Sequence, residues 1–128
     1  MTDRQLLKEF ERGTLEPFHH ADHVHVAFAY LKQYPPAEAL ARFSSGLQHL
    51  AGLHGQANLY HETITWAYVC LIRQRMADPG PETWEAFRQA NPDLLLWKDG
   101  FLDRYYRQET LASERARRMF LFPDKRRG

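Results

Sequence analysis

Tyr60-His61-Glu62-Thr63-Ile64-Thr65, followed by the apolar run Trp66–Ile72, is the stretch around which the fold is organised. A histidine and a carboxylate stand where a helix is expected to begin, directly before one of the two most apolar segments of the chain. The other such segment is Val24–Leu31, preceded by His19-His20-Ala21-Asp22-His23. Both have apolar residues at helical spacing; in Val24–Leu31 they cover almost all sides, which is typical of a buried helix, and in the helix after Tyr60 they form one wide face. We therefore expect two buried helices whose polar starts face one another.

Helical spacing extends over the rest of the chain, and no stretch alternates apolar and polar residues as a strand would. The fold class is therefore predicted to be all-α, a bundle of about four main helices with additional short helices, in a single domain over residues 1–128 whose basic end, 124–128, is frayed. The expected helices are one capped by Thr2 or Asp3 and ended by Gly13, then about His19–Tyr34, one beginning at Pro36 and ending before the Gly52–Asn58 loop, about Tyr60–Ala77, Glu82–Ala90, a short one around Phe101–Tyr106, and Glu114–Phe120 capped by Ser113. Breaks are expected at Thr14–Phe18, Tyr34–Pro36, Asp78–Pro81 and Asp99–Gly100.

Composition narrows the class of protein. The net charge of +1 gives no overall attraction to nucleic acid, and we expect no nucleic-acid partner. The longest uncharged apolar run, Ile64–Ile72, is far shorter than the roughly 20 residues that span a bilayer. The single cysteine, Cys70, allows no internal disulfide, and the first residues do not resemble a signal peptide. These features predict a soluble cytoplasmic protein without a membrane partner, and they leave self-association open.

The histidines near the two helix starts form a candidate metal site. His20 and His23 are three residues apart and project from one helix face. If successive helices alternate in direction, the second and fourth run parallel, and their starts lie at the same end of the bundle. His61 then supplies a third nitrogen, so that His20, His23 and His61 are the predicted ligands of a divalent transition metal whose identity the ligand types leave open.

A metal-dependent enzyme is one function that this site predicts. Glu62 is the candidate catalytic base, and Tyr60, Thr63 and Thr65 are candidate substrate-binding residues. The alternative is a non-catalytic binding or interaction module. Its polar pocket at the helix ends holds a small anion, because unpaired N–H groups and helix dipoles favour negative charge there. A third interpretation gives the histidines structural roles only.

Two further features have structural interpretations. Cys70 lies among apolar residues, which predicts packing in the core rather than a reactive thiol. Ser44-Ser45-Gly46 lies inside an expected helix without the strand and turn of a nucleophile elbow, so it predicts a close contact between helices.

A set of short phrases carries a resemblance to a known group of proteins. The phrases are His20-x-x-His23, Tyr60-His61-Glu62-Thr63-x-Thr65, Asn91-Pro92-x-Leu94, Tyr105-Tyr106 and Pro123-Asp124. Over roughly residues 10–124, the chain resembles a family of small, uncharacterised, all-helical bacterial proteins, with Tyr-His-Glu-Thr as the most distinctive phrase. The resemblance implies that His20, His23, His61 and Glu62 are the positions of interest, and it implies no particular reaction.

Overall fold

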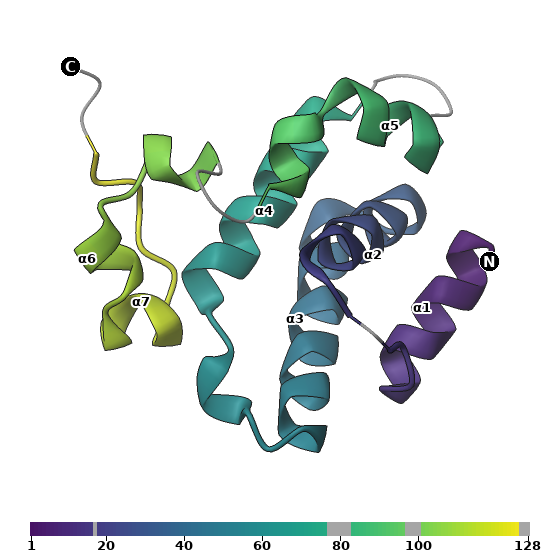
Figure 1. The fold of residues 1–128 in the computed structure, drawn as a ribbon, viewed down its shortest axis with the longest axis horizontal. Coiled ribbons are helices and arrows are strands. Elements are labelled where there is room, and N and C mark those ends of the chain that lie inside the picture. The colour runs from purple at the N-terminus through teal and green to yellow at the C-terminus, as the bar shows by residue number, and fades with distance from the viewer. Residues whose placement is uncertain (17, 77–82, 97–100, 126–128) are drawn as a thin grey trace.

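The computed structural model describes residues 1–16, 18–76, 83–96 and 101–125, and every regular element in these ranges is a helix. Figure 1 shows α6 and α7 on one side of α4, with α1, α2 and α3 on the other. The all-α prediction is confirmed. The elements are α1 (Asp3–Arg12), α2 (His20–Gln33), α3 (Pro36–Leu53), η1 (Ala57–Leu59), α4 (Glu62–Arg75), α5 (Trp84–Ala90), η2 (Pro92–Leu95), η3 (Phe101–Arg104), α6 (Gln108–Leu111) and α7 (Glu114–Arg118), where η denotes a 3-10 helix.

The first helix, α1, begins and ends at the predicted residues. The Thr2 hydroxyl accepts the Gln5 backbone N–H, and the Gln5 side chain accepts the Thr2 backbone N–H, which is a complete capping box. Gly13 ends the helix with a φ of 76°, in the left-handed region that glycine adopts without strain. The apolar stripe is buried, and Phe10 is fully inaccessible to solvent.

Helix α2 is the centre of the core. Val24 and the unbroken run Val26–Leu31 are buried, because α1, α3, α4 and α5 all contact this helix. The prediction of an apolar helix covered on almost all sides is therefore confirmed. Its aromatic rings meet those of other helices, with Phe28 packed 5.0 Å from Phe87 and Tyr30 packed 6.0 Å from Phe10 between ring centroids.

Gly46 allows α1 and α3 to approach closely, as predicted for the Ser44–Gly46 segment. A Cβ atom at this position would lie 2.1 Å from Cε2 of Phe10. Since real Cβ atoms do not approach other atoms so closely, any side chain here requires the Phe10 ring to move. The glycine thus fixes where the Phe10 ring sits in the core.

Helix α4 differs from the prediction in which of its residues are covered. Tyr68, Val69 and Ile72 are buried, but Cys70 is exposed. The interpretation of Cys70 as a core residue was wrong. Helix α4 is in contact with α2, α3 and α7, and Cys70 lies on a part of its circumference that stays exposed.

The chain after α5 is more finely divided than predicted. The expected helix around Phe101–Tyr106 is the 3-10 turn η3, and α6 was not predicted. Beyond α7 an extended segment runs back over the molecule, where the Tyr106 hydroxyl donates to the Leu121 carbonyl at 2.7 Å. Asp124 accepts the Arg107 backbone N–H at 3.1 Å and the Thr110 hydroxyl. This part of the predicted frayed end is therefore held by hydrogen bonds.

Several sequence predictions fall outside the described residues. They are the part of the Thr14–Phe18 turn that contains Pro17, the end of the fourth helix at Ala77, the break at Asp78–Pro81, the turn at Asp99–Gly100 and the end of the chain at 126–128. Within the described ranges, no helix is long and apolar enough to cross a bilayer.

Candidate functional site

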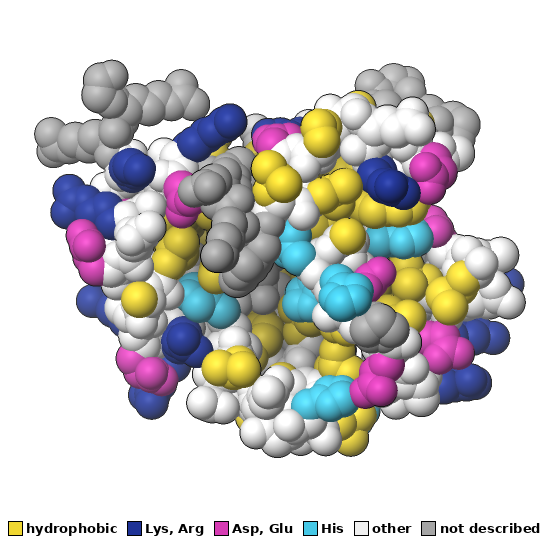
Figure 2. Space-filling model, in the orientation of Figure 1, with side chains coloured by type: hydrophobic (Ala, Val, Ile, Leu, Met, Phe, Trp, Pro, Cys, Tyr) yellow, Lys and Arg dark blue, Asp and Glu magenta, His cyan; other side chains and the backbone are white. Residues whose placement is uncertain are grey.

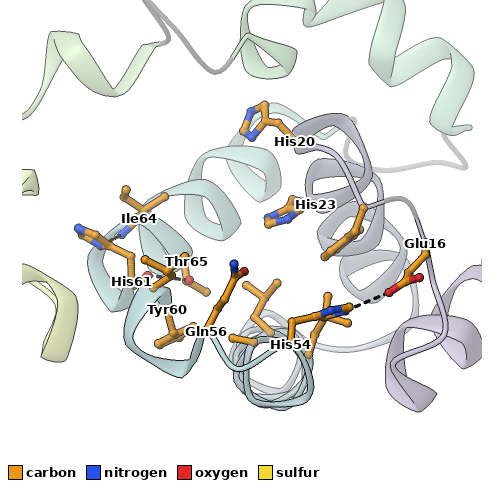
Figure 3. A pocket seen from close by; sticks show the side chains of 14 residues that line it. Glu16, His20, His23, His54, Gln56, Tyr60, His61, Ile64 and Thr65 are labelled. Atoms are coloured by element: carbon orange, nitrogen blue, oxygen red, sulfur yellow. Dashed lines mark hydrogen bonds and ion pairs between the residues drawn. The ribbon is translucent and has the colours of Figure 1, made fainter.

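A cavity of about 1030 Å³ opens between α2, α3 and α4, and we call it the central cavity. Most of its wall is apolar surface, and Figure 2 shows histidine side chains gathered around a hollow in this face of the molecule. Figure 3 shows the site from close by. The lining residues are Glu16, Phe18, His20, His23, Leu47, Leu50, Ala51, His54, Gln56, Leu59, Tyr60, His61, Ile64 and Thr65.

His23 is the polar group placed most directly in this cavity, as Figure 3 shows. Its ring stacks on Phe18, with 4.2 Å between centroids and 24° between planes, and it makes no hydrogen bond to any described residue. Burial lowers the pKa of the imidazole to about 4, helped by His20, while Asp22 opposes the shift. His23 is therefore neutral at pH 7, and its ring nitrogens are left for a ligand.

His20 lies next to His23 but has partners of its own. Its Nε2–H donates to the Leu94 carbonyl at 2.9 Å, and its ring packs edge-on against Tyr68 at 5.2 Å. The His20 and His23 ring centroids are 6.4 Å apart. Burial lowers the pKa of His20 as well, against the opposing effect of the Leu94 hydrogen bond. The neutral tautomer of His20 carries its proton on Nε2, because a carbonyl oxygen can only accept.

The two helix starts share the central cavity without meeting as closely as predicted. Figure 1 shows α2 foreshortened, whereas α3 and α4 extend across the view, so α2 crosses α4 rather than running beside it. The start of α2 therefore meets the middle of α4, where His20 packs on Tyr68. His61 lies at the cavity wall, about two helical turns before Tyr68.

His61 uses both ring nitrogens within the protein. Its Nδ1 accepts the Ile64 backbone N–H at 3.1 Å, which caps α4, and its Nε2–H donates to the Leu111 carbonyl at 2.7 Å. Burial is the main cause that lowers the pKa of His61, and the positive charge of Arg117 adds to it. To coordinate a metal, His61 would have to give up one of these two bonds.

The side chains of Glu62 and Tyr60 are hydrogen-bonded to each other. The Tyr60 hydroxyl donates to Oε1 of Glu62 at 2.6 Å and lies 2.6 Å from the Ser44 hydroxyl, which is therefore the donor to Tyr60. Burial raises the pKa of Tyr60, and the bond to Glu62 adds to the shift. Tyr60 lines the cavity, whereas Glu62 does not; Glu62 is the last member of the hydrogen-bonded chain Ser44–Tyr60–Glu62.

The two threonines point to different parts of the molecule. The Thr63 hydroxyl, fully buried, lies 2.7 Å from the Ala116 carbonyl and 2.8 Å from the Met119 carbonyl, and it accepts the Leu121 backbone N–H at 3.1 Å. It thus joins α4 to the segment after α7. The Thr65 hydroxyl donates to the His61 carbonyl at 2.8 Å and lines the cavity.

The rim of the cavity contains residues that the sequence did not single out. His54 Nε2 lies 3.2 Å from Oε1 of Glu16, and the two side chains are 45% and 62% exposed. The Gln56 amide points into the opening in Figure 3. All three lie in connections between helices, where no periodic pattern marks a wall residue. For His54 and Gln56 the sequence signals are Gly52, Gly55 and Asn58, which mark a loop but not a cavity wall.

The donor set can be compared with what a metal needs. Among the described residues, no group of three or more His, Cys, Asp or Glu side chains lies close enough to share one ion. Catalytic zinc sites use about three protein ligands. A metal bound by His20 and His23 would therefore need its other donors from water or from a ligand, and the predicted three-histidine site stays a prediction.

Neither a protein-family model, nor a curated protein, nor a solved structure matches this chain. The resemblance to a bacterial helical family also stays a prediction, and the function is argued from the site alone.

Proposed function

We propose that this protein binds a largely apolar small molecule in the central cavity. The observation that carries the proposal is the combination of a large, mostly apolar cavity with one uncommitted imidazole, His23. Small-molecule sites in proteins commonly measure about 300–1,000 Å³ and have apolar walls with a few polar groups that orient the ligand. The predicted bundle of four main helices is part of the proposal, since three of these helices supply the wall.

The environment of His23 fixes the kind of polar contact that it offers. A neutral imidazole has one N–H donor and one nitrogen acceptor. Its stacking on Phe18 holds the ring in place, so a ligand does not have to order it. Apolar surface supplies most of the binding free energy, and His23 selects the orientation.

The anion-binding module, predicted as an alternative, has less support. No lysine or arginine among the described residues lines the central cavity. A negative charge moved from water to an apolar wall without a positive partner loses its solvation. An uncharged ligand avoids this loss, which is why we favour it.

The metal-dependent enzyme is the second candidate. It is supported by the His20 and His23 rings, which lie 6.4 Å apart and are kept neutral by burial, the form that coordinates metals. In this proposal Glu62 acts as base only after it leaves Tyr60. Elemental analysis of untagged protein tests this candidate. If metal is lost in His20→Ala/His23→Ala but kept in His61→Ala, a two-histidine site is supported. If metal is lost in all of these variants, the predicted three-histidine site is supported.

The binding proposal is tested with N-phenyl-1-naphthylamine, an uncharged probe that fluoresces more strongly in apolar surroundings. Ala51→Trp fills the cavity from α3, while Ala41→Trp places the same side chain on an exposed position of α3 outside it. We expect saturable binding of one probe per chain, a Kd at least about tenfold higher in Ala51→Trp, and a change below about twofold in Ala41→Trp. Absence of saturable binding, or equal losses in the two variants, would contradict the proposal.

A further inference from the structure

Beside the central cavity lies a second, much smaller space, which we call the inner pocket; its additional lining residues Val24, Phe43 and Tyr68 are buried. It measures about 40 Å³ and lies between α2, α3 and α4. Val24, Phe43, Leu47 and Ile64 give it an apolar wall. The two spaces are adjacent, because five residues line both of them: His20, His23, Leu47, Ile64 and Thr65.

His20, His23, Thr65 and Tyr68 add polar side chains to this wall, and the atoms that we consider as ligand partners are those of His23 and Thr65. The His23 ring has no hydrogen bond to a described residue, so it offers one donor and one acceptor. The Thr65 hydroxyl uses its proton for the His61 carbonyl, which leaves its oxygen lone pairs as acceptors. A ligand group placed here can therefore both donate and accept.

The size of the inner pocket limits what that group can be. The inner pocket measures about 40 Å³ against about 1030 Å³ for the central cavity, so it receives a small group of the ligand and not its body. A hydroxyl fits this space. A phosphate, sulfate or carboxylate brings a negative charge that no described cationic side chain there can meet.

We propose that the inner pocket receives a hydroxyl group of the ligand, which makes the ligand an apolar alcohol or phenol. This inference rests on the proposed function and adds the ligand class. The hydroxyl donates to the unprotonated nitrogen of His23 or to the Thr65 oxygen, and accepts from the His23 N–H. The apolar body of the ligand then extends from the inner pocket into the central cavity.

Three matched naphthalenes, competing with N-phenyl-1-naphthylamine at pH 7.5, test the ligand class. They are 2-naphthol, naphthalene and 2-naphthoate, which share a ring system and differ in the group that reaches the inner pocket. We expect 2-naphthol to bind at least about tenfold more tightly than either of the others. Equal binding of naphthol and naphthalene would overturn the inference, since an ordered water would then serve the inner pocket as well. Stronger binding of naphthoate would overturn it as well.

A substitution tests whether His23 is the partner. His23→Phe keeps a ring to stack on Phe18 and removes both nitrogens, whereas His49→Phe makes the same change at an exposed position of α3 that lines neither space. We expect His23→Phe to bind 2-naphthol only as tightly as naphthalene, whereas His49→Phe should keep the preference for naphthol and change the Kd of the uncharged probe by less than about threefold. A retained preference for naphthol would overturn the role of His23.

The two proposals fail in different ways. If the uncharged probe does not bind the unaltered protein, the proposed function fails. If the probe binds but naphthol has no advantage, only the ligand class fails. Should His23→Phe not fold, long-range 1H–15N spectra of the unaltered protein decide: added 2-naphthol must shift the His23 ring signals, and unshifted signals would overturn the contact.

Discussion

The starts of α2 and α4 carry the same kind of residues and use them differently. At α2, His23 stacks on Phe18 and leaves its nitrogens to the cavity. At α4, the ring nitrogens of His61 and the hydroxyl of Thr63 all make hydrogen bonds within the protein. A histidine at a helix start is therefore available to a ligand in one case and has a structural role in the other. The difference is whether backbone groups of the protein hydrogen-bond its ring nitrogens.

The largest expected effect is on the α4 side, in Thr63→Val. The substitution keeps the shape of a fully buried side chain but leaves the Leu121 N–H and two carbonyl groups without their partner. We expect a loss of about 2–3 kcal/mol in the free energy of unfolding, measured by urea denaturation. Thr65→Val is the matched control on the same helix, because its hydroxyl donates to the His61 carbonyl of its own helix and joins no segment after α7. Equal losses in the two variants would remove the special role of Thr63.

The next effect belongs to the α2 side and depends on pH. The pKa of His23 falls from 6.5 to about 4 on folding, so the unfolded chain binds more protons between these values. Stability is therefore fully present above about pH 6.5 and is lost as the pH falls toward about 4, by up to about 2–3 kcal/mol.

His23→Phe should remove much of this pH dependence, as urea denaturation at pH 7.5, 5.5 and 4.5 will measure. A part remains, because the pKa values of His20 and His61 are lowered as well. An unchanged slope in His23→Phe would mean that His23 is not the neutral, buried group of the α2 start.

A smaller effect is expected from His61→Ala. Loss of the helix cap at Ile64 and of the bond to Leu111 should lower the free energy of unfolding by about 1–2 kcal/mol. The affinity for 2-naphthol should change by less than about threefold, since the His61 nitrogens are not available to a ligand. His49→Ala, at an exposed position, controls for removal of a histidine. If His61→Ala weakened naphthol binding as much as His23→Phe, the contrast between the two helix starts would be lost.

The smallest effect is expected from Glu62→Gln. The amide oxygen of glutamine can still accept the Tyr60 hydroxyl, so stability should change by less than about 0.5–1 kcal/mol. Naphthol binding should be unchanged. A specific loss of naphthol binding without a loss of stability would bring Glu62 back as a residue of the ligand site.

The elements of the fold were easier to predict than the partners of its polar side chains. Thr2, Gly13 and the apolar period of α2 are local signals, and they located helices that the structure contains. The partner of His61 is the Leu111 carbonyl, 50 residues away, and no local pattern marks it. The same is true of Thr63, whose partners follow α7. His20 and His23 were predicted to lie together because they share a helix face, which is again a local relation.

The crossing of α2 over α4 could not be predicted from helix lengths and short connections. Those features favour antiparallel neighbours, whereas the angle between two packed helices depends on how their side chains interdigitate. The exposure of Cys70 has a similar origin. An apolar run all round a helix does not tell which stripe its neighbours leave uncovered.

The hydroxyl of Thr63 also has a consequence for how the chain folds as it is synthesised. Its partners at residues 116–121 leave the ribosome more than 50 residues after Thr63 itself. Until then a side chain that ends fully buried has no carbonyl to bond, so the start of α4 stays incomplete while α1, α2 and α3 can already pack. Because such long-range contacts form late, the hydrogen bonds at the start of α4 are completed only after the C-terminal segment has packed against it.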